Sequence, residues 1–229
     1  MRFQDAAPDA RAVVYAGIQA DPLVAKAAEL LAGATWEERV LARAAMNGES
    51  TDPDAWRMMF PALFTTDDAT HLERAEGVLA AAISVARRGE QVRSQFRGAI
   101  VEALTETLVR RRLAARSVGV AATAVRRERR ILFDGVRADV HPFDVTVEIE
   151  GASQAIDCKW GARGISADVL HQLDDARTHA ADEDESLQPI LVVYDAARSC
   201  VARLDRHTAP RANLRLVSLE TLDELAEPG

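Results

Sequence analysis

The chain has 229 residues, of which 48% are hydrophobic and 28% are charged, a composition typical of a soluble globular protein and not of a disordered one. No apolar run approaches the ~20 residues needed to span a bilayer, and the first ten residues lack the basic start and apolar stretch of a signal peptide. The only two cysteines, Cys158 and Cys200, exclude a disulfide framework and a cysteine-based zinc cluster. We therefore expect a cytoplasmic protein without a membrane partner.

The net charge of −8 would argue against a nucleic-acid partner, but this charge is distributed unevenly. Residues 87–137 contain thirteen arginines and five acids, which gives a segment of +8 between two acidic ends. Lysine occurs only at Lys26 and Lys159, while every other basic residue is arginine. The charge pattern therefore leaves a phosphate-binding function open, and it makes each lysine worth attention.

Residues 1–90 carry the start and stop signals of several short helices. Asp21 precedes an apolar pattern that ends at Gly33, and Thr35 with Glu38 forms a capping box for the next helix. A longer helix is predicted after Asp68, with its end near residue 88. We expect an all-helical N-terminal region over residues 1–90, which would serve recognition or partner binding.

Residues 91–229 are predicted to form an α/β domain. A long amphipathic helix over residues 91–116 has an apolar residue at every fourth position along one stripe. Strands are expected at residues 131–133, 143–149, 154–160, 189–194 and 214–217. Helices are expected after Ser166 and over residues 220–227. This order predicts a mixed central sheet flanked by helices and preceded by the helical region.

The hairpin of residues 143–160 contains the strongest chemical signal. Asp157 and Lys159 project from one face of the second strand because side chains alternate along a strand. Pairing around a turn at Gly151 can bring Asp144, on the first strand, to the same edge. Two carboxylates suit Mg²⁺, which lowers the pKa of a bound water, and a lysine beside them can offset negative charge on a reacting phosphate.

Pro142-Phe143-Asp144, followed across the hairpin by Asp157-Cys158-Lys159, resembles the signature of the PD-(D/E)XK (restriction-endonuclease-like) nuclease superfamily. The resemblance extends over residues 91–225, because a long helix precedes the hairpin and a helix and two strands follow it. The inserted Phe143 departs from the family pattern.

The resemblance implies a restriction-endonuclease-like fold and a role for each motif residue. Asp144 and Asp157 would be ligands of Mg²⁺ or Mn²⁺, and Lys159 would be the catalytic lysine. Glu102, four residues after Gly98, would be a third metal ligand, and Gln172 would add a glutamine from the following helix. The family also implies a homodimer.

Several assignments have alternatives. Glu102 points nearly opposite the apolar stripe of its helix, so an exposed structural glutamate fits the pattern equally well. Asp139 could replace Asp144 if the strand starts earlier. Asp157 and Lys159 could also form a solvated face of a nuclease fold that has lost its activity, because fold does not imply function.

Two arginine clusters adjoin the proposed site in sequence. We predict that they follow a nucleic-acid backbone, whose phosphates dominate the affinity of such complexes. The alternative is a solvated face paired with the acidic ends of the chain. The clusters consist of Arg110, Arg111, Arg112, Arg126, Arg127, Arg129 and Arg130.

The sequence therefore predicts a Mg²⁺-dependent endodeoxyribonuclease, a hydrolase of phosphodiester bonds in DNA, with RNA as a substrate left open. The alternative is a catalytically inactive module of the same fold that binds nucleic acid or a protein partner. Zinc-site spacing, the nucleophile elbow of serine hydrolases and the phosphate-binding loop of nucleotide motors do not occur in the sequence.

Overall fold

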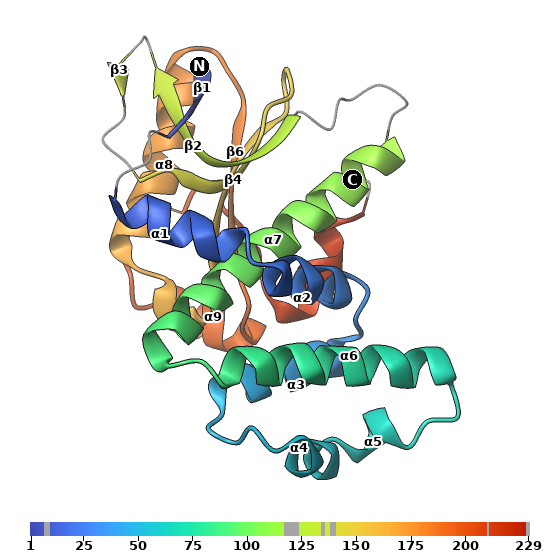
Figure 1. The fold of residues 1–229 in the computed structure, drawn as a ribbon. Coiled ribbons are helices and arrows are strands. Elements are labelled where there is room, and N and C mark those ends of the chain that lie inside the picture. The colour runs from blue at the N-terminus through green and yellow to red at the C-terminus, as the bar shows by residue number, and fades with distance from the viewer. Residues whose placement is uncertain (7–9, 117–123, 134–135, 138–140, 210, 228–229) are drawn as a thin grey trace. The chain divides into compact units, whose positions relative to one another are not determined.

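The computed structural model describes residues 1–6, 10–116, 124–133, 136–137, 141–209 and 211–227 (Figure 1). The chain forms two compact units. The helical unit comprises Asp9–Thr107, and the sheet unit comprises Met1–Pro8 together with Leu108–Gly229. The boundary between them falls within the long helix α7 (Glu90–Arg116), whereas the sequence suggested a division at residue 90.

The helical unit is built from short helices whose ends follow the predicted capping signals. Asp21 accepts a hydrogen bond from the backbone of Leu23, and Asp68 caps the last helix before α7. Thr35 and Glu38 form the reciprocal capping box that their spacing predicted. The helices are α1 (Ala10–Gln19), α2 (Pro22–Ala32), α3 (Trp36–Asn47), α4 (Pro53–Met59), α5 (Pro61–Phe64), α6 (Ala69–Ala86) and the first part of α7.

The sheet unit contains one mixed sheet with the order β1-β2-β4-β5-β6-β7, and β3 pairs with β2 outside this path. Strands β1, β2, β4 and β5 pair antiparallel, whereas β6 and β7 continue the sheet in parallel from β5. The strands are β1 (Arg2–Asp5), β2 (Val125–Phe133), β3 (Val136–Arg137), β4 (Phe143–Val147), β5 (Ser153–Lys159), β6 (Leu187–Val193) and β7 (Arg215–Val217).

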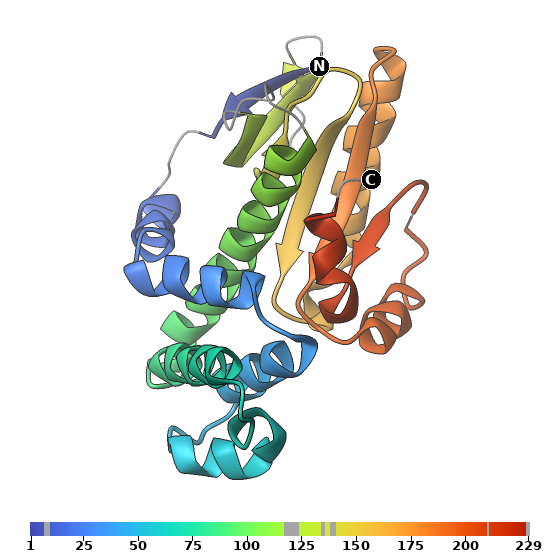
Figure 2. The same ribbon diagram turned by 90° about the vertical axis from the view of Figure 1, so that its right-hand side faces the viewer.

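Helix α8 (Ala167–Asp182) provides the crossover that parallel pairing of β5 with β6 requires. It packs beside β6, as Figure 2 shows, and its residues Leu170 and Leu173 share a buried core with Ala155 and Leu191 of the two strands. The remaining elements are η2 (Ala162–Gly164), α9 (Ala197–Leu204) and η3 (Leu219–Leu225).

The observed α/β class, with helices that precede and flank a mixed sheet, confirms the coarse prediction. Strand β1 departs from it, because residues 2–5 pair with β2 although the first ninety residues were expected to be helical throughout. The helix expected near the C-terminus is the 3-10 helix η3. Among the described residues, no helix combines the length and hydrophobicity that a membrane span requires.

Candidate active site

The candidate site lies where β4 begins and β5 ends. The antiparallel register pairs Val145 with Ile156, so its extension by one residue sets Asp144 opposite Asp157. Directly opposite residues of an antiparallel pair project to the same face, with Cβ atoms roughly 5 Å apart. The structure therefore brings together the two carboxylates of the predicted motif, and the alternation along β5 adds Lys159 to them.

Lys159 interacts electrostatically with both carboxylates of this group. Its Nζ donates a hydrogen bond to Oδ1 of Asp157, and Oδ2 of Asp144 accepts one from the backbone N–H of Cys158 at 2.6 Å. Burial acts to lower the pKa of Lys159, but the negative charges of Asp157 and Asp144 outweigh this effect and raise its pKa above the ordinary value. The side chain is therefore an ammonium ion at neutral pH.

A short loop holds the stem of Lys159 in place. A Cβ added to Gly164 of η2 would lie 2.9 Å from Cδ of Lys159, so only glycine leaves room for the lysine there. The backbone N–H of Ala162 donates to Oδ2 of Asp195 at 3.0 Å, and Tyr194 donates its N–H to the carbonyl of Lys159 at 2.8 Å. The sequence did not mark Gly164 or Asp195, because a glycine and an acid distant in sequence carry no motif.

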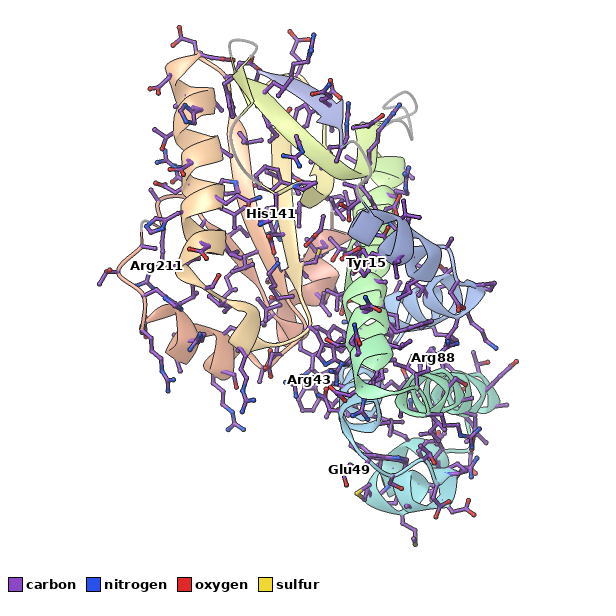
Figure 3. All side chains as sticks on the ribbon, turned by 60° about the vertical axis from the view of Figure 1, so that its left-hand side comes forward. Tyr15, Arg43, Glu49, Arg88, His141 and Arg211 are labelled. Atoms are coloured by element: carbon purple, nitrogen blue, oxygen red, sulfur yellow. The ribbon has the colours of Figure 1, made fainter. Side chains whose placement is uncertain are left out.

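Gln172, the glutamine that the resemblance adds to the site, lies near the start of β4. It is buried on α8, and its Nε2 donates a hydrogen bond to the backbone carbonyl of His141 at 2.8 Å. His141 lies three residues before Asp144, at the entry to β4 (Figure 3). Gln172 thus fixes the segment that leads into the first carboxylate.

Glu102 belongs to the helical unit and has a different environment. Its carboxylate is 5% exposed and accepts hydrogen bonds from Tyr15 Oη at 2.5 Å and Gln19 Nε2 at 2.8 Å. Figure 3 shows Tyr15 on α1 directed toward α7. The contacts explain why a glutamate on this helix face is buried, and they connect α1 to α7 within the helical unit. Asp139, the alternative to Asp144, lies outside the described residues.

No cluster of three or more His, Cys, Asp or Glu side chains suited to one metal ion occurs among the residues that the structure describes. The pair of carboxylates at Asp144 and Asp157 is nevertheless compatible with Mg²⁺, because this ion usually binds one or two protein carboxylates and takes its other ligands from water and substrate. The chemistry of the donors therefore fits the predicted metal.

Two of the predicted phosphate-binding arginines are buried and act within the protein. Arg112 donates through Nη2 to Oε1 of Gln154 at 2.6 Å. Arg129 donates to the backbone carbonyl of Phe3 at 2.7 Å and forms ion pairs with Asp5 and Glu148. These arginines hold α7 and β1 to the sheet, which is a structural role.

The other members of the two clusters are more accessible. Arg110 is half-buried and donates to the backbone carbonyl of Val125 at 2.8 Å. Arg111 and Arg126 are exposed, and Arg126 lies 3.8 Å from Asp5. Arg127 and Arg130 are half-buried on β2. The clusters are thus divided between internal contacts and the surface.

Neither the models of known protein families nor the curated protein sequences match this chain. Among solved structures, the protein VC1899 from Vibrio cholerae is similar, with a TM-score of 0.47 and 15% sequence identity. The match covers 98% of this chain and 56% of the Vibrio protein, so the chain spans about half the length of that relative. A similarity at this level assigns no family and no activity.

Proposed function

We propose that the chain is a Mg²⁺-dependent endonuclease of the PD-(D/E)XK superfamily that hydrolyses phosphodiester bonds in DNA. The proposal rests on one observation, which is the convergence of Asp144, Asp157 and Lys159 at the end of the β4–β5 pair. If these residues were only a solvated strand face, nothing would require the charges of both carboxylates to raise the pKa of Lys159, the only lysine of the sheet unit.

The order of the elements supports the same assignment. The long helix α7 precedes three antiparallel strands, β2, β4 and β5, and α8 then leads to the parallel strand β6. This is the order of elements that the sequence resemblance implied. Gln172 on α8, which binds the entry to β4, adds a residue from the helix where the resemblance expects a glutamine.

The residues divide the chemistry between them. Asp144 and Asp157 would hold Mg²⁺, which when bound supplies a water of lowered pKa and positive charge beside the phosphate. Hydrolysis forms a bond from water oxygen to phosphorus and breaks the bond to the leaving oxygen. Lysine is protonated at neutral pH, so the ammonium of Lys159 would offset the negative charge that develops on the phosphate oxygens.

Cleavage of supercoiled plasmid DNA in the presence of Mg²⁺ tests this function. We expect Asp157→Ala and Lys159→Ala to lower the rate by at least about 100-fold, in the range seen when one electrostatic group is removed from an active site. Lys26→Ala is the matched control, because Lys26 is the other lysine and is exposed on α2. Wild-type rates for both active-site variants would refute the assignment, and an RNA substrate in a parallel reaction would identify a ribonuclease.

A catalytically inactive binding module is the second candidate. It is favoured by the ion pair between Lys159 and Asp157, which already satisfies one carboxylate, and by the contacts of Glu102 with α1. A thermal-unfolding titration with Mg²⁺ and Mn²⁺ separates the candidates. The nuclease should gain metal-dependent stability that Asp144→Asn removes, whereas the inactive module should show no such gain.

A further inference from the structure

Three exposed arginines lie beside the loop that holds Lys159. Arg163 is in η2, Arg198 is the second residue of α9, and Arg206 follows the end of that helix. Among the described residues, no carboxylate lies within ion-pair distance of these three side chains, which we call the η2–α9 arginines. In contrast, Arg211, on the loop after α9 in Figure 3, pairs with Asp205 at 3.3 Å.

Hydrogen bonds place η2 against both ends of α9. On one side of Arg163, the N–H of Ala162 donates to Asp195, which lies three residues before Arg198. On the other side, the carbonyl of Ile165 accepts a hydrogen bond from Nε of Arg203 at 3.1 Å. The same carbonyl lies 3.2 Å from Nε2 of His207, the residue after Arg206. The three arginines therefore lie on segments that hydrogen bonds hold together, namely η2 and α9 with the turn that follows it.

This surface adjoins the candidate active site directly. Gly164, the residue after Arg163, packs against the stem of Lys159. Arg198 lies at the start of α9 and Arg206 two residues after its end, and the eight residues of the helix extend about 12 Å along its axis. Phosphates of one DNA strand advance about 3.4 Å along the axis per nucleotide, so the surface matches roughly three to four nucleotides beside the site.

Unpaired positive charges gathered on one surface repel one another and favour a polyanionic partner. We propose that the η2–α9 arginines bind the phosphodiester backbone of the DNA strand next to the bond that is cut. That the ligand is DNA rests on the proposed function, whereas the existence of a positively charged binding surface is inferred from the three arginines alone. This surface replaces the α7 and β2 clusters, of which Arg112 and Arg129 are committed to internal contacts.

Equilibrium binding without cleavage tests the proposal. Fluorescence anisotropy with a 20-base-pair DNA duplex, in buffer with EDTA, would give the dissociation constant of the full chain from about 50 to 200 mM salt. Removal of all three charges in R163A/R198A/R206A should reduce the slope of log K against log salt by about 2.7. Over this range, wild-type affinity should then fall about 40-fold more than that of the variant.

A second triple variant is the control. R111A/R126A/R127A removes the same charge from accessible positions of α7 and β2, and we expect it to keep the wild-type slope. Equal slopes for wild type and the η2–α9 variant, or an equal loss in the control, would overturn the proposal. Binding of duplex RNA but not DNA would also overturn it. Salt-dependent DNA binding that needs the η2–α9 arginines would uphold it even if the plasmid assay shows no cleavage, and only the proposed function would then fail.

Discussion

Gly164→Ala is the substitution that most directly tests how the loop controls the candidate site. The added Cβ would lie 2.9 Å from Cδ of Lys159 and 3.1 Å from its Cβ and Cγ. Carbon atoms in favourable contact are about 3.5–4.0 Å apart, so the lysine stem or the loop must move by roughly 0.5–1 Å. The loop is held by Asp195 and Arg203, so most of this movement should fall on Lys159.

The expected effects follow from that displacement. Overpacking of this kind costs about 1–3 kcal/mol of stability, and a misplacement of about 1 Å at a catalytic group can lower the rate about 100-fold. We therefore expect Gly164→Ala to fold, to lose about 100-fold in kcat for plasmid cleavage, and to weaken the contact of Lys159 with Asp157.

A second measurement makes the outcome independent of activity. The chain has two lysines, so ¹³C-lysine labelling gives two Cε resonances, and Lys26 serves as an internal reference. In Gly164→Ala, the resonance of Lys159 should shift while that of Lys26 stays in place. Gly89→Ala is the matched control, because a Cβ there would meet nothing within 4 Å. A wild-type cleavage rate together with an unshifted Lys159 resonance would refute the positioning role of Gly164.

Three further predictions concern buried charges. Glu38→Ala removes a fully buried carboxylate that binds Arg74 at 2.9 Å and caps α3, and should cost about 2–4 kcal/mol in urea unfolding. Tyr15→Phe removes a hydrogen bond to the buried Glu102 and should cost about 1–3 kcal/mol in the same assay. The raised pKa of Lys159 means that its pairing stabilises the fold fully below pH 10.5, its unfolded value, and less as the pH rises through the folded pKa. The stability advantage of wild type over Lys159→Met should therefore be constant at neutral pH and shrink above about pH 10.5.

Control substitutions of exposed residues show whether any change in these helices lowers stability. Glu37→Ala removes an exposed carboxylate beside Glu38 and should change the free energy of unfolding by less than about 0.5 kcal/mol. The difference in stability between wild type and Lys26→Met, by contrast, should not change as the pH rises above about 10.5. A stability difference between wild type and Lys159→Met that grows at high pH would contradict the sign of the pKa shift.

The sequence predicted those parts of the molecule that depend on neighbouring residues. The capping box of Thr35 and Glu38 formed because the two groups are three residues apart on one helix turn. Asp157 and Lys159 share a face because strand side chains alternate, and the turn at Gly151, whose φ is 73°, lets β4 return beside β5. Local spacing thus specified most of the β4–β5 site.

The contacts that sequence reasoning missed join residues far apart in the chain. Helix α9 was not predicted, because its apolar positions Cys200 and Leu204 occupy only two turns and resemble a loop between two strands. Asp195, just before α9, and Arg203, within it, bind the backbone of Ala162 and Ile165 more than thirty residues earlier. No local pattern encodes such a pairing.

The same distinction applies to the predicted phosphate-binding arginines. Charge counting treats every arginine as available, but the fold decides which ones meet an acid or a backbone carbonyl. Arg129 was counted toward DNA binding, yet β1 brings Phe3 and Asp5 to it from the other end of the sequence. The η2–α9 arginines lie in the C-terminal part of the chain, whose net charge is negative. The net charge of that part therefore gives no sign of these three positive charges. Net charge over a segment therefore predicts a binding surface only after the fold has shown which charges are already paired.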